Sequence, residues 1–100
     1  MTKKTPKKLD MKKVKRDYSK ILEEAAKVAK ERQGQYGEAV ESVELACKIL
    51  NETFNIKLTV LQFCYVMVSL KLSRQKFKFK KDNLLDSINY LAIGIMSEEK

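Results

Sequence analysis

The chain contains no histidine and no tryptophan, and it has only one proline, three glycines and two cysteines in 100 residues. Without histidine it lacks the most common general base of enzymes and the most common zinc ligand. The scarcity of proline and glycine favours helices, since these residues are the main helix breakers. Cys47 and Cys64 lack metal-ligand spacing and are expected to be reduced core thiols. This composition favours a helical binding protein over an enzyme, with no catalytic residue, metal site or cofactor.

Long hydrophobic runs are also absent. The most apolar stretch begins at Leu58 and is interrupted at Lys71, which is too short for a membrane span of about 20 apolar residues. The N-terminus is charged from its third residue and shows no apolar segment of the secretory type. We therefore expect a cytoplasmic protein without a membrane partner.

Positive charge is plentiful but uneven. The net charge is +8, and two blocks carry more than all of it: residues 1–20, with nine Lys/Arg against two Asp, and residues 71–81, with six Lys/Arg and no acid. Residues 1–10 have almost nothing to bury and are predicted to form a disordered basic tail. Residues 11–100 are enough for one small domain with a single core. Basic blocks of this kind attract polyanions without reading their sequence.

The hydrophobic periodicity predicts an all-α fold, a single small bundle of about four helices at residues 11–32, 38–54, 58–74 and 82–96. The third helix is apolar almost all round, so we expect burial on most of its sides, with Thr59 as its N-cap. Its exposed edge is expected at one narrow polar stripe: Gln62, Ser69, Ser73 and Lys76. The second and fourth helices each have one clean apolar face expected to pack in the core: Ala39, Val43, Ala46, Cys47, Leu50 and Phe54, and Leu84, Leu85, Ile88, Leu91, Ala92, Ile95 and Met96.

Two glycines flank an aromatic residue after the first helix. Gly34 suits a left-handed C-cap that ends the helix, and Gly37 suits a second reversal before the next one. Tyr36, held between them, either plugs the end of the bundle or stacks on a flat ligand. Arg32 differs from the other charged residues of this helix because it returns to the apolar side at the last turn.

Cations and a carboxylate are predicted to meet at the far end of the third helix. Lys71 and Arg74 end its inward face, where they either balance the helix dipole or bind a phosphate or carboxylate. On the fourth helix, Asp86 and Asn89 flank the core, whereas Asp82 is explained as an N-cap. The alternative to a ligand site is a buried pair of Asp86 with Arg74 that only locks the two helices together.

The segment between the last two helices alternates lysines with aromatics. Lys76, Lys78, Lys80 and Lys81 surround Phe77 and Phe79. Aromatics for stacking among cations for phosphates are the components of a single-stranded nucleic-acid site. The competing interpretation is that the two phenylalanines cap the open end of the bundle.

Several polar residues share a recognisable order and spacing. They are Arg32-x-x-x-Tyr36-Gly37, Lys57-Leu58-Thr59, Met67-x-x-x-Lys71-x-x-Arg74 and Lys81-Asp82-Asn83-x-x-Asp86-x-x-x-Tyr90. Over about residues 20–95 this pattern resembles a family of short phage and prophage proteins without an assigned activity. The resemblance implies a protein of phage type in the cytoplasm of a bacterial host cell.

A more distant similarity is to the MazG-type all-α nucleotide pyrophosphohydrolases, which hold Mg²⁺ with paired acidic motifs. Glu41 and Glu44 match the first motif in spacing, but the helical wheel places both opposite the apolar face. The second motif is replaced by Asp82-x-x-x-Asp86. Two carboxylates from one helix are a weak magnesium site, so the departure counts against catalysis.

We therefore expect a non-catalytic protein that captures an anionic ligand, in first place a nucleotide. Arg32, Lys71 and Arg74 would meet the phosphate, Tyr36 would stack, and Asp86 with Asn89 would bind a base or sugar. In a phage this suggests a counter-defence role that sequesters a host nucleotide signal. The alternatives are a DNA- or RNA-associated protein and a Mg²⁺-dependent nucleotide hydrolase. A homo-oligomer whose interface uses some of these polar residues also remains open.

Overall fold

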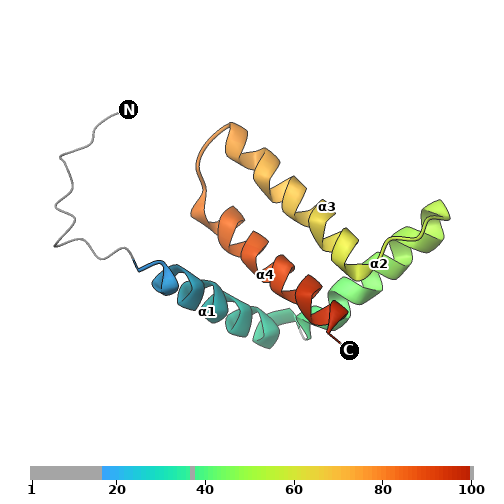
Figure 1. Cartoon of the computed structure of the whole chain (residues 1–100), viewed down its shortest axis with the longest axis horizontal. Helices are drawn as coiled ribbons and strands as arrows, with labels where there is room; N and C mark the ends of the chain where they lie inside the picture. Colours follow the sequence, from blue (N-terminus) through green and yellow to red (C-terminus); the bar gives the residue numbers. More distant parts are fainter. Residues whose placement is uncertain (1–16, 37, 100) are drawn as a thin grey trace.

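The computed structural model describes residues 17–36 and 38–99, with the side chains of residues 34–36 left out. Its described part contains four α-helices and one short 3₁₀ turn: α1 Ser19–Tyr36, α2 Ala39–Phe54, α3 Val60–Ser73, η1 Arg74–Lys76 and α4 Lys81–Glu98. Figure 1 shows α3 and α4 side by side as an antiparallel pair. α1 lies across the outside of α4, and α2 lies near the start of α3 and the end of α4. The predicted all-α bundle of about four helices is confirmed.

The turn from α2 to α3 is held by side chains that satisfy backbone groups. Asn55 takes the left-handed conformation after α2, with φ 53°. The Asn51 amide donates to the Leu58 carbonyl at 2.9 Å, and its oxygen accepts the Leu58 N–H at 2.9 Å. Thr59 then begins α3 with a capping box, in which its hydroxyl accepts the Gln62 N–H and the Gln62 side chain accepts the Thr59 N–H. The predicted N-cap at Thr59 is confirmed.

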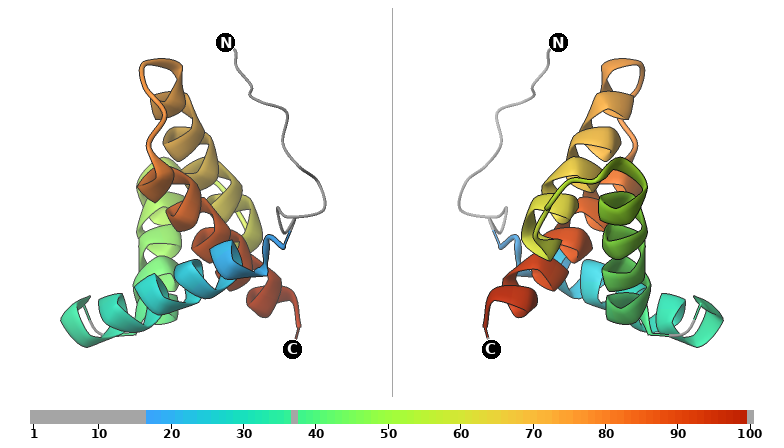
Figure 2. Two further views of the ribbon diagram at one scale, coloured as in Figure 1. Left: turned by 90° about the vertical axis from the view of Figure 1, so that its left-hand side faces the viewer. Right: turned by 90° about the vertical axis from the view of Figure 1, so that its right-hand side faces the viewer.

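The hydrophobic core is small. Six hydrophobic residues of the described chain are buried: Ala25, Val43, Cys47, Phe63, Cys64 and Leu85. The expectation that both cysteines are reduced core residues agrees with their burial as free thiols. α3 and α4 approach closely at Gly94, where an added Cβ would lie 2.7 Å from Leu61 Cδ1. The core therefore lies between the α3–α4 pair and the middle of α2 (Figure 2).

The bounds of α1 differ from the prediction at both ends. Asp17 and Tyr18 precede the helix, and the Asp17 carboxylate accepts hydrogen bonds from the Ser19 hydroxyl at 2.6 Å and the Ser19 N–H at 3.0 Å. These bonds hold the pKa of Asp17 below its usual value. At the other end the helix continues to Tyr36, so Gly34 is not a C-cap. A single glycine costs only about 1 kcal/mol inside a helix.

Some predictions lie outside the described residues. They are the disordered tail at residues 1–10, the helical start at residues 11–16 and the backbone reversal at Gly37.

The predicted burial of α3 is wrong for most of its circumference. Of α3 only Phe63 and Cys64 are buried, and large apolar residues on its other side are about half exposed. In α2 the predicted face is only partly covered, because Val43 and Cys47 are buried whereas Phe54 is 65% exposed. A helical wheel identifies apolar directions, but it cannot say which of them another element covers.

The predicted apolar face of α4 is also largely uncovered. Of its seven residues only Leu85 is buried, and Ile95 and Met96 are more than half exposed. The residues of α4 that are buried include the polar side chains of Asn83, Asp86 and Ser87. α4 therefore turns a polar and small-residue face toward α3 and α1, and this face provides the centre of the candidate site.

Candidate functional site

A buried carboxylate on α4 joins three helices. The side chain of Asp86 is 7% exposed, and each of its oxygens meets a cation. Its Oδ1 lies 3.0 Å from Arg32 Nη1 on α1, and its Oδ2 lies 2.9 Å from Lys71 Nζ on α3. We call Asp86, Arg32 and Lys71 the charged trio. Because one carboxylate faces two cations, the trio has a net charge of +1.

The two cations differ in their access to solvent. The Lys71 side chain is 16% exposed, whereas that of Arg32 is 50% exposed. Lys71 therefore mainly compensates the buried carboxylate, since an unpaired charge there would carry a large desolvation cost. Arg32 has further N–H donors beyond the one that meets Asp86. Its guanidinium is fixed in direction by Asp86 and still open to an anion.

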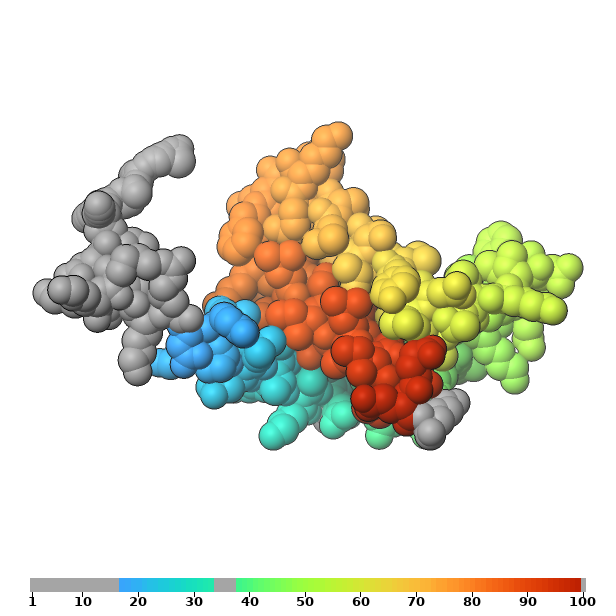
Figure 3. Space-filling view, in the orientation of Figure 1, coloured from blue at the N-terminus to red at the C-terminus, as the bar shows by residue number. Residues whose placement is uncertain are grey.

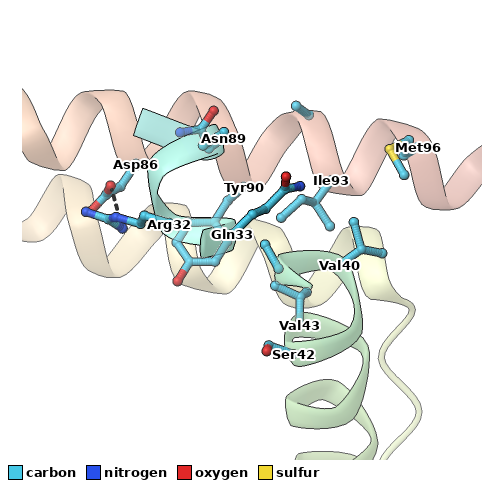
Figure 4. A pocket seen from close by; sticks show the side chains of 13 residues that line it. Arg32, Gln33, Val40, Ser42, Val43, Asp86, Asn89, Tyr90, Ile93 and Met96 are labelled. Atoms are coloured by element: carbon cyan, nitrogen blue, oxygen red, sulfur yellow. Dashed lines mark ion pairs between the residues drawn. The ribbon is translucent and has the colours of Figure 1, made fainter. Parts of the chain in front are cut away.

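A cavity of about 320 Å³ adjoins the charged trio. It opens between α1, α2 and α4, as Figure 4 shows from close by. Most of its lining is apolar, and the ion pair of Arg32 with Asp86 lies at one end of it. The lining residues are Ala29, Arg32, Gln33, Ala39, Val40, Ser42, Val43, Asp86, Asn89, Tyr90, Ala92, Ile93 and Met96.

Asn89 has a structural contact as well as a place in this lining. Its side-chain amide donates to the Ala25 carbonyl of α1 at 3.0 Å. This bond and the ion pair of Arg32 with Asp86 tie α1 to α4 on one wall of the cavity. A third link, from Lys81 Nζ to Glu24 Oε1 at 2.8 Å, lies between exposed side chains and contributes little.

The structure brings together some of the predicted ligand residues and separates others. Arg32, Asp86 and Asn89 line the cavity, and Lys71 contacts Asp86 without lining it. The predicted pair of Asp86 with Arg74 is wrong, because Asp86 pairs with Arg32 and Lys71. α3 ends at Ser73, and Arg74 begins the 3₁₀ turn with its side chain exposed and away from the lining. Tyr36 ends α1, and its side chain lies outside the described residues.

Three lining residues with polar groups were not among the predicted ligand residues: Gln33, Ser42 and Tyr90. Figure 4 shows the Tyr90 ring between the side chains of Arg32 and Gln33. Tyr90 could have been predicted, because it follows Asp86 by four residues and residues four apart lie on the same side of a helix. Nothing in the sequence marks Ser42, because its position in the lining depends on how α2 crosses α4.

The segment from η1 to α4 forms a second candidate site, which we call the lysine–phenylalanine loop, residues 76–80. Phe77 is 86% exposed and Phe79 is 70% exposed, so they do not cap the bundle as one interpretation had it. The Gln75 side chain closes the loop by donating to the Lys80 carbonyl at 3.1 Å and accepting the Lys80 N–H at 2.9 Å. The lysines at 76, 78 and 80 are exposed, and Lys81 follows at the start of α4.

Acidic residues do not gather into a metal site. Within residues 17–36 and 38–99, no group of three or more Cys, Asp or Glu side chains is placed to hold a metal ion. Glu41 and Glu44 are exposed on α2, in agreement with the prediction from the helical wheel.

Comparisons with known proteins give a family. A family model described as a domain of unknown function, DUF6378, matches residues 20–98. No curated protein and no solved structure matches the chain. Among the helices described, none is long and apolar enough to cross a membrane.

Proposed function

Since the chain belongs to the DUF6378 family, whose description names no activity, we propose a function from the site itself. The protein binds a small anionic ligand, a nucleotide, in the cavity between α1, α2 and α4 and does not convert it. The observation that carries this proposal is Arg32, a half-exposed guanidinium that a buried carboxylate orients at the edge of a mainly apolar cavity.

The charge of the trio supports an anionic ligand. Each oxygen of Asp86 already meets a cation, so the negative charge of the carboxylate is compensated within the trio. What remains toward the cavity is the excess positive charge on Arg32, and guanidinium groups suit phosphates because they donate two parallel hydrogen bonds. Binding without turnover is supported by the sequence, which contains no histidine, the most common general base of enzymes.

The rest of the lining supports a ligand with a flat apolar part. Tyr90 and Ile93 offer aromatic and aliphatic surface, and the amides of Gln33 and Asn89 lie at hand for hydrogen bonds. Sites for small molecules typically have volumes of about 300–1,000 Å³, apolar walls and a few convergent polar groups. At about 320 Å³ the cavity is at the lower end of this range. It suits a mononucleotide better than a larger dinucleotide.

A thermal-shift screen of the full chain tests this proposal. Mono-, di-, tri- and cyclic nucleotides are compared with and without Mg²⁺. A ligand at one hundred times its Kd stabilises the folded state by about 2.7 kcal/mol, which raises the Tm by several degrees in a domain of this size. We expect Arg32→Ala to abolish the shift and Arg74→Ala, at an exposed arginine outside the lining, to preserve it.

Two outcomes would contradict the proposal. If no nucleotide class shifts the Tm, or if Arg32→Ala and Arg74→Ala respond alike, the cavity is not a nucleotide site. Release of phosphate or pyrophosphate from a bound nucleotide would instead establish the hydrolase alternative.

The wider context of this proposal comes from the resemblance to phage and prophage proteins. A phage-type protein that sequesters a host nucleotide signal without consuming it would act in counter-defence. The same screen addresses this, because such a role requires a shift with a signalling nucleotide, for example a cyclic one, at lower concentration than with common nucleotides.

The lysine–phenylalanine loop favours a second candidate function, association with single-stranded nucleic acid. Phe77 and Phe79 are exposed on a loop closed by Gln75, so their rings are presented without prior rearrangement. Stacking contributes about 1–3 kcal/mol per base, and the surrounding lysines would make affinity fall steeply with salt.

Filter binding or fluorescence anisotropy with a labelled oligonucleotide tests this candidate. Replacing Phe77 and Phe79 together by alanine should lower affinity at least about tenfold. The matched control replaces two exposed aromatic residues elsewhere, Tyr18 and Phe54. Equal affinity of the loop variant and the unaltered chain would remove the candidate.

A further inference from the structure

Within the described residues of one copy of the chain, other elements cover only one side of α3. Tyr65, Val66, Leu70 and Leu72 are 52%, 49%, 45% and 49% exposed. In Figure 1, α4 runs along one side of α3 and no other helix runs along the opposite side. The space-filling view shows this outer side of α3 forming an edge of the molecule (Figure 3). An apolar patch of this kind is typical of an interaction site.

The polar side chains among these apolar residues make hydrogen bonds to backbone groups of α3 and its N-cap. The Ser69 hydroxyl donates to the Tyr65 carbonyl at 2.9 Å, and the Ser73 hydroxyl donates to the Leu70 carbonyl at 2.7 Å. The side-chain oxygen of Gln62, Oε1, accepts the Thr59 N–H in the capping box. Because these groups already have partners, another surface can cover them at little cost in lost hydrogen bonds to water.

The same side of α3 is uncharged. No Asp, Glu, Lys or Arg occurs from Val60 to Leu70, and Lys71 turns to Asp86 on the inner side. This is unusual in a chain with a net charge of +8. A nucleic acid or an acidic protein would gain nothing from charge here. Two copies of this basic chain, by contrast, can approach at an uncharged surface with the least mutual repulsion.

The core of one copy is small, so its stability is expected to depend on a partner that covers more apolar surface and is present whenever the chain folds. A domain of this length buries about two thirds of its surface, yet the described chain buries six hydrophobic residues and leaves many large ones exposed. A second copy of the same chain is always available. We propose that the outer face of α3, residues 62, 65, 66, 69, 70, 72 and 73, is the interface of a homodimer in which both copies use this same face.

The mass of the full chain in solution is the first test. Light scattering after size exclusion, or sedimentation equilibrium, should give twice the chain mass of 11.6 kDa at micromolar concentration. A mass of one chain over the whole accessible concentration range would overturn the proposal.

Charged substitutions then locate the interface. Val66→Arg and Leu72→Arg each place a cation on the proposed face, and both residues are half exposed, so one copy can accommodate the change. We expect the dimer dissociation constant to rise by at least about tenfold in each, which is equivalent to about 1.4 kcal/mol. Ile95→Arg, at a 57% exposed position on α4, is the matched control and should remain a dimer. If the α3 variants dimerise like the unaltered chain, the face is assigned wrongly.

A cross-linking experiment keeps the proposal testable if a charged variant loses its helices. Ser69→Cys and Thr53→Cys each add one exposed thiol, on α3 and on α2, while Cys47 and Cys64 stay buried. With a short bis-maleimide, Ser69→Cys should give a covalent dimer much faster than Thr53→Cys. Equal rates would indicate random collision and contradict the interface.

Discussion

Asp86 illustrates how one residue sets the properties of its neighbours. Its position at the edge of the core could be predicted from the spacing of α4, as could the proximity of a cation from α3. The choice of Lys71 over Arg74 could not, because it depends on where α3 ends and the 3₁₀ turn begins. The partnership with Arg32 also lay beyond the sequence, since these residues are brought together only by the packing of α1 on α4.

At the residue scale we predict that Asp86→Asn destabilises the protein by about 3–5 kcal/mol, because it leaves the largely buried Lys71 without its counter-charge. Arg32→Gln should cost below about 1 kcal/mol, since Arg32 is half exposed and Asp86 keeps its other partner. Urea denaturation followed by far-UV circular dichroism measures both. The matched control is Asp82→Asn, an exposed acid on the same helix, and a similar cost for Asp82 and Asp86 would contradict the prediction.

At the scale of the elements, the sequence predicted the identity of the four helices well and their buried faces poorly. Helical periodicity and the Thr59 cap are local properties, so they were readable. The burial of Asn83 and Ser87 in place of Leu84 and Ile88 was not, because it is decided by the rotation of α4 against α3. α1 shows the same limit, as Gly34 lies inside a helix that the glycine was expected to end.

The turn between α2 and α3 gives a prediction for one side chain that supports two helices. Asn51→Ala removes both of its hydrogen bonds to Leu58 and should lower the free energy of unfolding by about 2 kcal/mol, at about 1 kcal/mol per bond. The control is the neighbouring exposed residue, changed as Glu52→Ala, for which a change within about 0.5 kcal/mol is expected. A loss below that control in Asn51→Ala would show that the turn holds without the side chain.

The close approach of α3 and α4 gives a prediction that depends on side-chain size. In Gly94→Ala the new Cβ meets only the flexible end of Leu61 at 2.7 Å, so the gain in helix propensity of about 1 kcal/mol should offset the shift of that side chain. Gly94→Val adds atoms toward the Leu61 backbone and Cys64 and should destabilise by about 1–3 kcal/mol. Thermal unfolding of the two variants tests this order, and equal stability of both would refute it.

At the scale of the whole molecule, the fold class, a small all-α bundle, was predictable because composition and periodicity determine it. The extent of burial was not. α3 is apolar almost all round, which predicted burial on most sides, yet one copy of the chain covers a single side. The discrepancy points to assembly, since a sequence records the surfaces that a protein buries with its partners as well as those it buries alone.

An association that completes the core links stability to protein concentration. We predict that the Tm of the full chain rises over an about hundredfold increase in concentration, because dissociation then accompanies unfolding. Differential scanning calorimetry measures this, and at each concentration Val66→Arg should have a lower Tm than the unaltered chain, because its dimer is weaker. A constant Tm for the unaltered chain would contradict the prediction.

The spacing of the side-chain bonds along the chain also implies an order of folding. The bonds that join α2 to the start of α3, η1 to the start of α4, and α3 to α4 connect residues 7, 5 and 15 positions apart, whereas the bond of Asn89 to Ala25 connects residues 64 positions apart. Closing a short loop loses less chain entropy and is faster. The last three helices can therefore assemble first and α1 last, which makes the wall that provides Arg32 the latest part of the cavity to form and the first to open.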